Sequence, residues 1–182
     1  MVRKPRILTI GYSDNSIDLF ISLLERSSVR LVADIRPNPS MSRFPNFERH
    51  ALAKELEKRG LSYRWFRTLG GQVFEPGKQE LHTALGNEND KQYAAAMNTV
   101  EFTKACRELI GLSASAVVAV MSDGCKTEVC HRRLLSDKLV TLGIRVVHIL
   151  GSEEGEEHGL HPGLEVKPNG NLVYTQKQLS LI

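Results

Sequence analysis

The chain of 182 residues has few cysteines, few aromatic residues and no long apolar run. Three cysteines are an odd number and too few for the disulfide framework of a small secreted protein. Its apolar stretches, such as residues 116–121, fall far short of the ~20 residues of a membrane-spanning helix. The basic N-terminus lacks the pattern of a cleaved secretion signal. We therefore expect a cytoplasmic protein with no membrane segment.

Cofactor motifs are absent as well. The sequence has no G-x-G-x-x-G and no Walker-type loop, which are the usual signatures of dinucleotide and ATP sites. Nor does it have the C-x2-C or H-x3-H spacing that makes a zinc site specific. We therefore expect no cofactor and no metal. A zinc site assembled without such spacing would have to draw on Cys125, Cys130, His131, His148, His158 and His161.

The net charge of +3 is small, but the charges are unevenly distributed. Residues 1–67 hold 13 Lys and Arg against 7 Asp and Glu, whereas the rest of the chain holds 11 against 14. Most such charges are typical of solvated helix faces. Arg36 and Arg43 differ because they lie in a proline-rich loop, where Phe44 and Phe47 could pack in the core or stack on a base.

Apolar runs and helical patterns alternate along the chain, which predicts an α/β fold. The C-terminal part looks like a small hairpin around residues 166–174, and 72–89 reads as a long loop with one short helical turn. We expect one domain over 1–182, with a core of about 6–150 and an extension of about 151–182. We expect the core to be a three-layer doubly wound sheet of about five mostly parallel strands. The strands are expected at 6–10, 29–35, 61–66, 115–122 and 144–150, and helices near 13–24, 46–60, 90–112 and 130–142.

Ligands of doubly wound sheets bind at the carboxyl ends of the strands. This rule brings four segments to one edge: Gly11–Tyr12, Asp34–Arg36, Gly70–Gly71 and the loop from Ser122 to Cys130. Asp34 and Arg36 are two residues apart, so they point to the same side if the strand continues. Two interpretations stay open, because the pair could orient one another as an ion pair or hold a ribose hydroxyl and a phosphate.

The segment from Ser122 to Arg133 carries the most chemistry. Cys130 is expected at a helix start, where backbone N–H groups attract anions and favour a thiolate. His131 could act as a general acid or base, and Arg132 or Arg133 could clamp a phosphate or carboxylate. The alternative is a small buried cysteine beneath the helix. The order of strand, cysteine-bearing loop, basic residue and helix is similar to that of cysteine-based phosphatases and rhodaneses. However, six residues separate Cys125 from Arg132, where the phosphatase loop has five.

Several motifs occur together in an order that resembles one family. They are Thr9–Ser13, Asp34-x-Arg36 with Pro39, Arg43-Phe44-x-x-Phe47, Leu61-x-Tyr63 with Leu69-Gly70-Gly71, Tyr93-x3-Met97 with Phe102, Cys130-His131-Arg132 and Val147-His148-Ile149. Over about residues 7–161 they are similar to DUF488, a domain-of-unknown-function family. The resemblance implies a Rossmann-like α/β fold and a strand-end site formed by the Asp-x-Arg and Cys-His-Arg motifs. It implies no settled reaction.

The chain departs from the family's pattern at one strand end. Many members carry Cys there and Glu two residues later, whereas this chain has Ser122 and Gly124, with Cys125 as an additional thiol. If a second thiol or that carboxylate were essential, the protein would be altered or would use Ser122 and Cys125 instead. Cys125 and Cys130 could also form a reversible disulfide.

Three functions are compatible with these residues. The first is an enzyme acting on a phosphate-bearing ligand, either a nucleotide or a nucleic-acid component. It assigns anion binding to Arg36, Arg43 and Arg132, the pocket to Tyr12, Gly70, Gly71 and Ser122, and proton transfer or nucleophilic attack to Asp34, Cys130 and His131. The second is cysteine-dependent sulfur transfer or redox chemistry. The third is a non-catalytic nucleic-acid-binding module, supported only by the basic first third.

Overall fold

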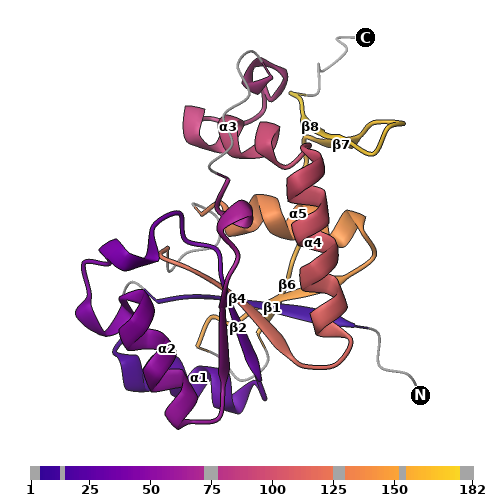
Figure 1. The fold of residues 1–182 in the computed structure, drawn as a ribbon. Helices are drawn as coiled ribbons and strands as arrows, with labels where there is room; N and C mark the ends of the chain where they lie inside the picture. Colours follow the sequence, from indigo (N-terminus) through magenta and orange to yellow (C-terminus); the bar gives the residue numbers. More distant parts are fainter. Residues whose placement is uncertain (1–4, 13–14, 72–77, 125–129, 152–154, 177–182) are drawn as a thin grey trace, which may run out of the picture.

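The computed structural model describes residues 5–12, 15–71, 78–124, 130–151 and 155–176. It is built on a six-stranded sheet with the order β3-β2-β4-β1-β5-β6 (Figure 1). The first five strands are parallel, and β6 pairs antiparallel with β5. They are β1 (Arg6–Gly11), β2 (Leu31–Asp34), β3 (Ser62–Trp65), β4 (Val118–Ser122), β5 (Arg145–His148) and β6 (Glu156–Glu157). The predicted α/β sheet is confirmed; β6 was missed because two residues show no alternation.

Helices cover both faces of the sheet, as Figure 1 shows. Leu8 and Ile10 of β1 point to the face covered by α1 (Ile17–Arg26) and α2 (Arg49–Lys58). Ile7 points to the opposite face, which α4 (Val100–Ser113) and α5 (Arg132–Thr141) cover. This alternation of neighbouring side chains between two apolar layers is what the period of two in a strand requires.

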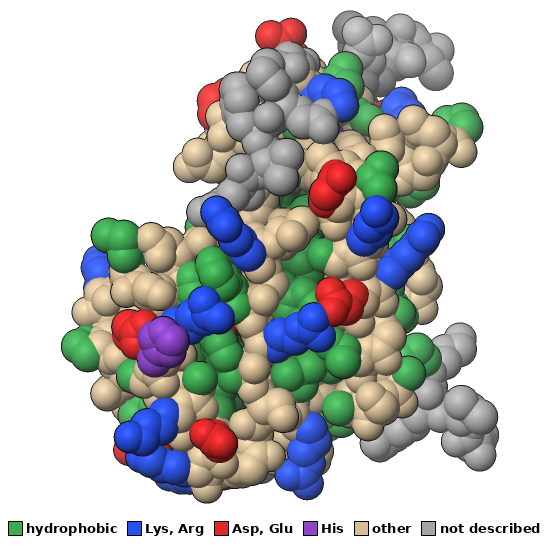
Figure 2. Space-filling model, viewed as in Figure 1, with side chains coloured by type: hydrophobic (Ala, Val, Ile, Leu, Met, Phe, Trp, Pro, Cys, Tyr) green, Lys and Arg blue, Asp and Glu red, His purple; other side chains and the backbone are tan. Residues whose placement is uncertain are grey.

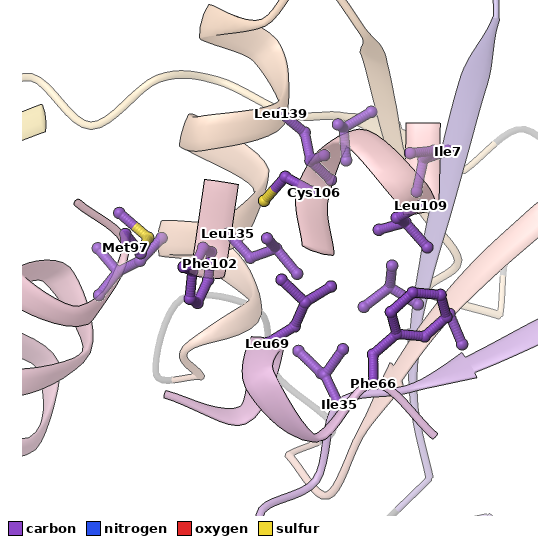
Figure 3. Close-up of a cluster of buried hydrophobic side chains, with 14 of the residues drawn as sticks. Ile7, Ile35, Phe66, Leu69, Met97, Phe102, Cys106, Leu109, Leu135 and Leu139 are labelled. Atoms are coloured by element: carbon purple, nitrogen blue, oxygen red, sulfur yellow. The ribbon is translucent and has the colours of Figure 1, made fainter. Parts of the chain in front are cut away.

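The α4 and α5 side of the sheet holds the larger apolar cluster (Figure 3). Cys106 of α4 lies inside it, fully buried, with Leu135 and Leu139 of α5 in the same cluster. Burial raises the pKa of the Cys106 thiol to about 12. Cys106 is therefore a small apolar core residue, as its position on the apolar face of the helix predicts.

The sequence predicts one helix over 90–112, and this prediction is wrong. Two helices, α3 (Glu88–Ala96) and α4, are separated by a turn at 97–99. The Thr99 hydroxyl oxygen accepts from the amide of Phe102 at 3.2 Å, and the hydroxyl donates to the carbonyl of Ala96 at 2.8 Å. It thereby serves the start of α4 and the end of α3. In Figure 1, α3 lies away from the sheet and beside the C-terminal hairpin.

The segments outside the sheet follow the prediction in outline. A single short 3-10 turn, η4 (Gln79–Leu81), lies in the described part of the predicted 72–89 loop, of which 72–77 are not described. The predicted C-terminal hairpin is formed by β7 (Leu164–Val166) and β8 (Leu172–Tyr174). Among the described residues, no helix has the length and apolar character needed to cross a membrane.

Candidate functional site

The carboxyl ends of β1, β2 and β4 meet at one edge of the sheet. Gly11 is in register with Ser122, and Asp34 with Met121. Gly11 permits a close approach there, because a Cβ at this position would overlap the carbonyl oxygen of Gly124 and crowd the Arg132 guanidinium. The ends of these strands thereby lie close together, as the sequence predicts.

The Asp34 and Arg36 side chains form a buried ion pair. The Arg36 Nε lies 3.0 Å from both carboxylate oxygens of Asp34, and Nη2 lies 2.6 Å from Oδ2. Tyr63 also donates to Asp34 Oδ2, at 2.6 Å. Asp34 is completely buried and Arg36 is 1% exposed. Of the two interpretations that the sequence leaves open, the structure shows the ion pair, so the charge of Arg36 is largely balanced within the protein.

Tyr12 and the end of Arg36 connect this pair to the surface. Arg36 Nη1 donates to the carbonyl of Phe47 at 2.7 Å, and the Tyr12 hydroxyl donates to Asp123 Oδ1 at 2.8 Å. The Tyr12 ring stacks on Phe47 with centroids 4.1 Å apart, which fixes its orientation. These groups form one wall of a small cavity of about 130 Å³, lined by Tyr12, Arg36, Asn38, Met41, Ser42, Arg43, Phe44 and Asp123.

Cys130 lies next to two polar side chains just before α5. Its Sγ is 3.0 Å from the Oγ of Ser122 and 3.9 Å from Nδ1 of His131. Burial raises the pKa of the Cys130 thiol, but His131, the charge of Arg132 and the Ser122 hydroxyl lower it more, to about 6. These neighbours therefore favour the thiolate form of Cys130.

A second cavity, of about 610 Å³, adjoins Cys130 and is called the large cavity below. His131 lines it, and among the described residues the buried His131 Nε2 has no hydrogen-bond partner. The Tyr93 hydroxyl donates to the carbonyl of Leu69 at 2.7 Å and so fixes the Gly70–Gly71 turn in the wall. The full lining is Pro37, Gly70, Gly71, Asn87, Asn89, Asp90, Gln92, Tyr93, Asp123, Gly124, Cys130 and His131.

Five polar residues of this lining were not predicted from the sequence: Asn87, Asn89, Asp90, Gln92 and Asp123. A signal for the first of them exists, because Asn87 is the N-cap of α3 and accepts from the amide of Asp90 at 2.8 Å. An N-cap pattern locates a helix start in the chain but does not show that the start faces a cavity. These residues make the large cavity rich in amide and carboxylate groups.

The predicted site residues do not all reach a cavity. Tyr12, Arg36, Arg43, Gly70, Gly71, Cys130 and His131 line one of the two cavities. Asp34 and Ser122 lie behind the wall, fully buried, against Arg36 and Cys130. Arg132 is 1% exposed, and its Nη2 donates to the carbonyl of Gly124 at 2.5 Å, so it fixes the position of Gly124 after β4. Cys125 lies outside the described residues, and with it any pairing to Cys130.

His148 and His158 belong to a buried chain of hydrogen bonds. His148 Nδ1 lies 2.7 Å from the Thr9 hydroxyl and His148 Nε2 lies 2.9 Å from His158 Nδ1. His158 Nε2 is 2.9 Å from Asp137 Oδ1, and Tyr174 donates to Asp137 Oδ2 at 2.9 Å. Among the described residues, no cluster of three His, Cys, Asp or Glu side chains could hold a metal ion.

The fold and the site define a doubly wound α/β protein with a low-pKa cysteine beside a strand-end cavity. The chain belongs to the family described as domain of unknown function DUF488, whose model matches residues 16–139. This confirms the family inferred from the motifs. No curated protein and no solved structure gives a significant match.

Proposed function

We propose that this protein is an enzyme that acts on a phosphate-bearing ligand, a nucleotide or nucleic-acid component, with the Cys130 thiolate as its reactive group. The cluster of Cys130, Ser122 and His131 beside the large cavity is the observation that carries this proposal. A thiolate is the nucleophilic form of cysteine. The unpartnered His131 Nε2, as far as the described residues extend, is available to exchange a proton or a hydrogen bond with a ligand.

The small cavity supports an anionic ligand. Arg36, Arg43 and Ser42 line it, and Asp123 lines both cavities, so one ligand can extend from the arginines toward Cys130. Arg43 is exposed and has no carboxylate within ion-pair distance among the described residues, whereas Arg36 is matched by Asp34. Arg43 therefore supplies the uncompensated charge for a phosphate, and Ser42 a hydroxyl donor.

Alkylation of Cys130 with iodoacetamide tests the reactive group. In a Cys125→Ser background, the rate should rise with pH around a midpoint of about 6 and level off above neutrality, because the thiolate is the reacting form. His131→Ala should move the midpoint upward, since His131 is the largest of the groups that lower this pKa. Mass spectrometry of peptides identifies the site, and Cys106 with its raised pKa serves as the unreactive internal control.

The same alkylation assay tests the ligand. Pyrophosphate or a mixture of nucleoside 5′-monophosphates should slow the modification of Cys130, and Arg43→Ala should reduce this protection by about tenfold in ligand concentration. Arg30→Ala is the matched control, because Arg30 is an exposed arginine at the opposite end of β2. If no phosphate probe changes the rate of Cys130 modification, the proposal of a phosphate-bearing ligand is wrong. If the alkylation rate has its pH midpoint near 8, the proposal of Cys130 as the reactive group is wrong.

Sulfur transfer is a second candidate, favoured by the ionised thiol and its hydroxyl neighbour. The Cys130 thiolate would attack the outer sulfur of thiosulfate, releasing sulfite and leaving a persulfide on the cysteine. We expect this reaction to add one sulfur atom to the Cys130 peptide, and Ser122→Ala to slow it severalfold. An unmodified Cys130 after thiosulfate rules this candidate out. Both functions need a reduced thiol, which is why we propose a cytoplasmic location.

A further inference from the structure

The edge strand β3 carries Trp65, the only tryptophan of the chain, and two arginine side chains lie near its ring. The Arg49 guanidinium, from the first turn of α2, lies 4.7 Å from the centroid of the Trp65 ring. Arg67, at the start of the short 3-10 turn η3 (Arg67–Gly70), lies 6.0 Å from the same centroid. We call Arg49, Trp65 and Arg67 the Trp65 face. It combines an aromatic ring with two planar cations.

Trp65 has a fixed orientation. Its indole Nε1 donates to the backbone carbonyl of Arg36 at 2.9 Å, and the ring stays partly exposed. In the sheet, Trp65 is in register with Asp34. The Trp65 face is therefore attached to the strand end that also carries the Asp34–Arg36 pair, and the hydrogen bond to Arg36 fixes the direction of the ring. An ordered ring loses little conformational entropy when a partner binds.

The charge of the Trp65 face is not balanced by carboxylates. Neither Arg49 nor Arg67 has a carboxylate within ion-pair distance in the part of the chain that the structure describes. Arg64 and Arg145, in contrast, pair with Glu108 and Glu157. A guanidinium that lies against a ring keeps its N–H groups directed to the solvent. Figure 2 shows Lys and Arg side chains spread over this side of the molecule, with Asp and Glu side chains among them.

We propose that the Trp65 face binds single-stranded nucleic acid. A partly exposed indole stacks on a base, and guanidinium groups both stack on bases and donate to phosphates. Arg43 lies over Phe44 in the same way, with 5.8 Å between guanidinium and ring centroid, so a second ring and cation of this kind lie at the small cavity. A duplex hides its base faces, and an acidic peptide has none, so a single strand is the polyanion that uses both components.

The unique tryptophan allows a direct test. Titration of the full chain with an oligothymidylate of about 10 nucleotides should quench the Trp65 fluorescence in a saturable way. Arg49→Ala and Arg67→Ala should each weaken binding by about threefold to tenfold and reduce the slope of log affinity against log salt by about 0.7 to 1. Arg30→Ala should bind like the unaltered chain, because Arg30 lies at the other end of the sheet.

Trp65→Phe and Trp65→Ala separate stacking from charge. With a fluorescently labelled oligonucleotide, Trp65→Ala should lose at least about fivefold in affinity and Trp65→Phe should recover part of it, because phenylalanine also stacks. Circular dichroism verifies that each variant folds. Oligonucleotide binding and alkylation of Cys130 are measured separately on the same chain, so a failure here is distinct from a failure of the proposed chemistry.

Three outcomes would overturn the proposal. One is the absence of quenching at low salt. Another is equal affinity for inorganic polyphosphate or polyglutamate, which would show that the face recognises charge without bases. The third is unchanged affinity in a folded Trp65→Ala variant.

Discussion

Replacing Asp34 with alanine should lower the free energy of unfolding by about 3–5 kcal/mol, because it leaves the Arg36 guanidinium buried without its counter-charge. Urea denaturation followed by circular dichroism measures the change. Tyr63→Phe is the matched control, since it removes one hydrogen bond to the same carboxylate and should cost only about 0.5–1.5 kcal/mol.

A double variant shows whether the cost arises from the unpaired charge. Asp34→Leu with Arg36→Met removes both charges, and it should be more stable than Asp34→Ala alone. A loss below about 1 kcal/mol for Asp34→Ala would contradict the buried ion pair. If Arg36 were instead held mainly by Phe47 and Tyr12, the double variant would be no more stable than Asp34→Ala, because it also loses those contacts.

Replacing Gly11 with alanine should destabilise the protein by about 3 kcal/mol, because the new methyl group would overlap the backbone carbonyl of Gly124. A backbone atom cannot move aside like the end of a flexible side chain. Gly124 would have to shift, and its contact with Arg132 would be disturbed. The measurements are the urea midpoint and the alkylation rate of Cys130, which we expect to fall together.

Gly111→Ala provides the control for that variant. Gly111 lies within α4, and a Cβ there would meet no heavy atom of the described residues within 4 Å. Alanine favours a helix over glycine, so this variant should be unchanged or more stable by up to about 1 kcal/mol. Equal effects of the two substitutions would show that the crowding at Gly11 is not important.

The sequence was sufficient for the five parallel strands of the sheet and for the edge at which their carboxyl ends meet. Apolar runs separated by helical patterns identify parallel strands, and the position rule for such sheets then brings Tyr12, Arg36 and Cys130 together. The sequence could not show that Asp34 neutralises Arg36. A carboxylate and a guanidinium two residues apart are compatible with either a mutual ion pair or a ligand site.

The polar wall supplied by α3 was beyond the sequence for a different reason. A single continuous helix over 90–112 would carry its apolar stripe along the sheet, and the turn at Thr99 depends on one hydroxyl that serves two helix ends. Side chains such as Asn87 and Asp90 reach the large cavity only because α3 leaves the sheet there. The position of a helix relative to the sheet leaves no pattern in the local sequence.

The buried chain from Thr9 to Tyr174 has a consequence for the boundaries of the folding unit. The family match ends at residue 139, yet Asp137 within it receives hydrogen bonds from His158 and Tyr174, both beyond that point. A chain truncated after residue 151 would lose these hydrogen bonds together with the fully buried side chains of Leu172 and Tyr174, at a cost of several kcal/mol. The C-terminal segment thus completes the core of a protein whose recognisable sequence stops before it.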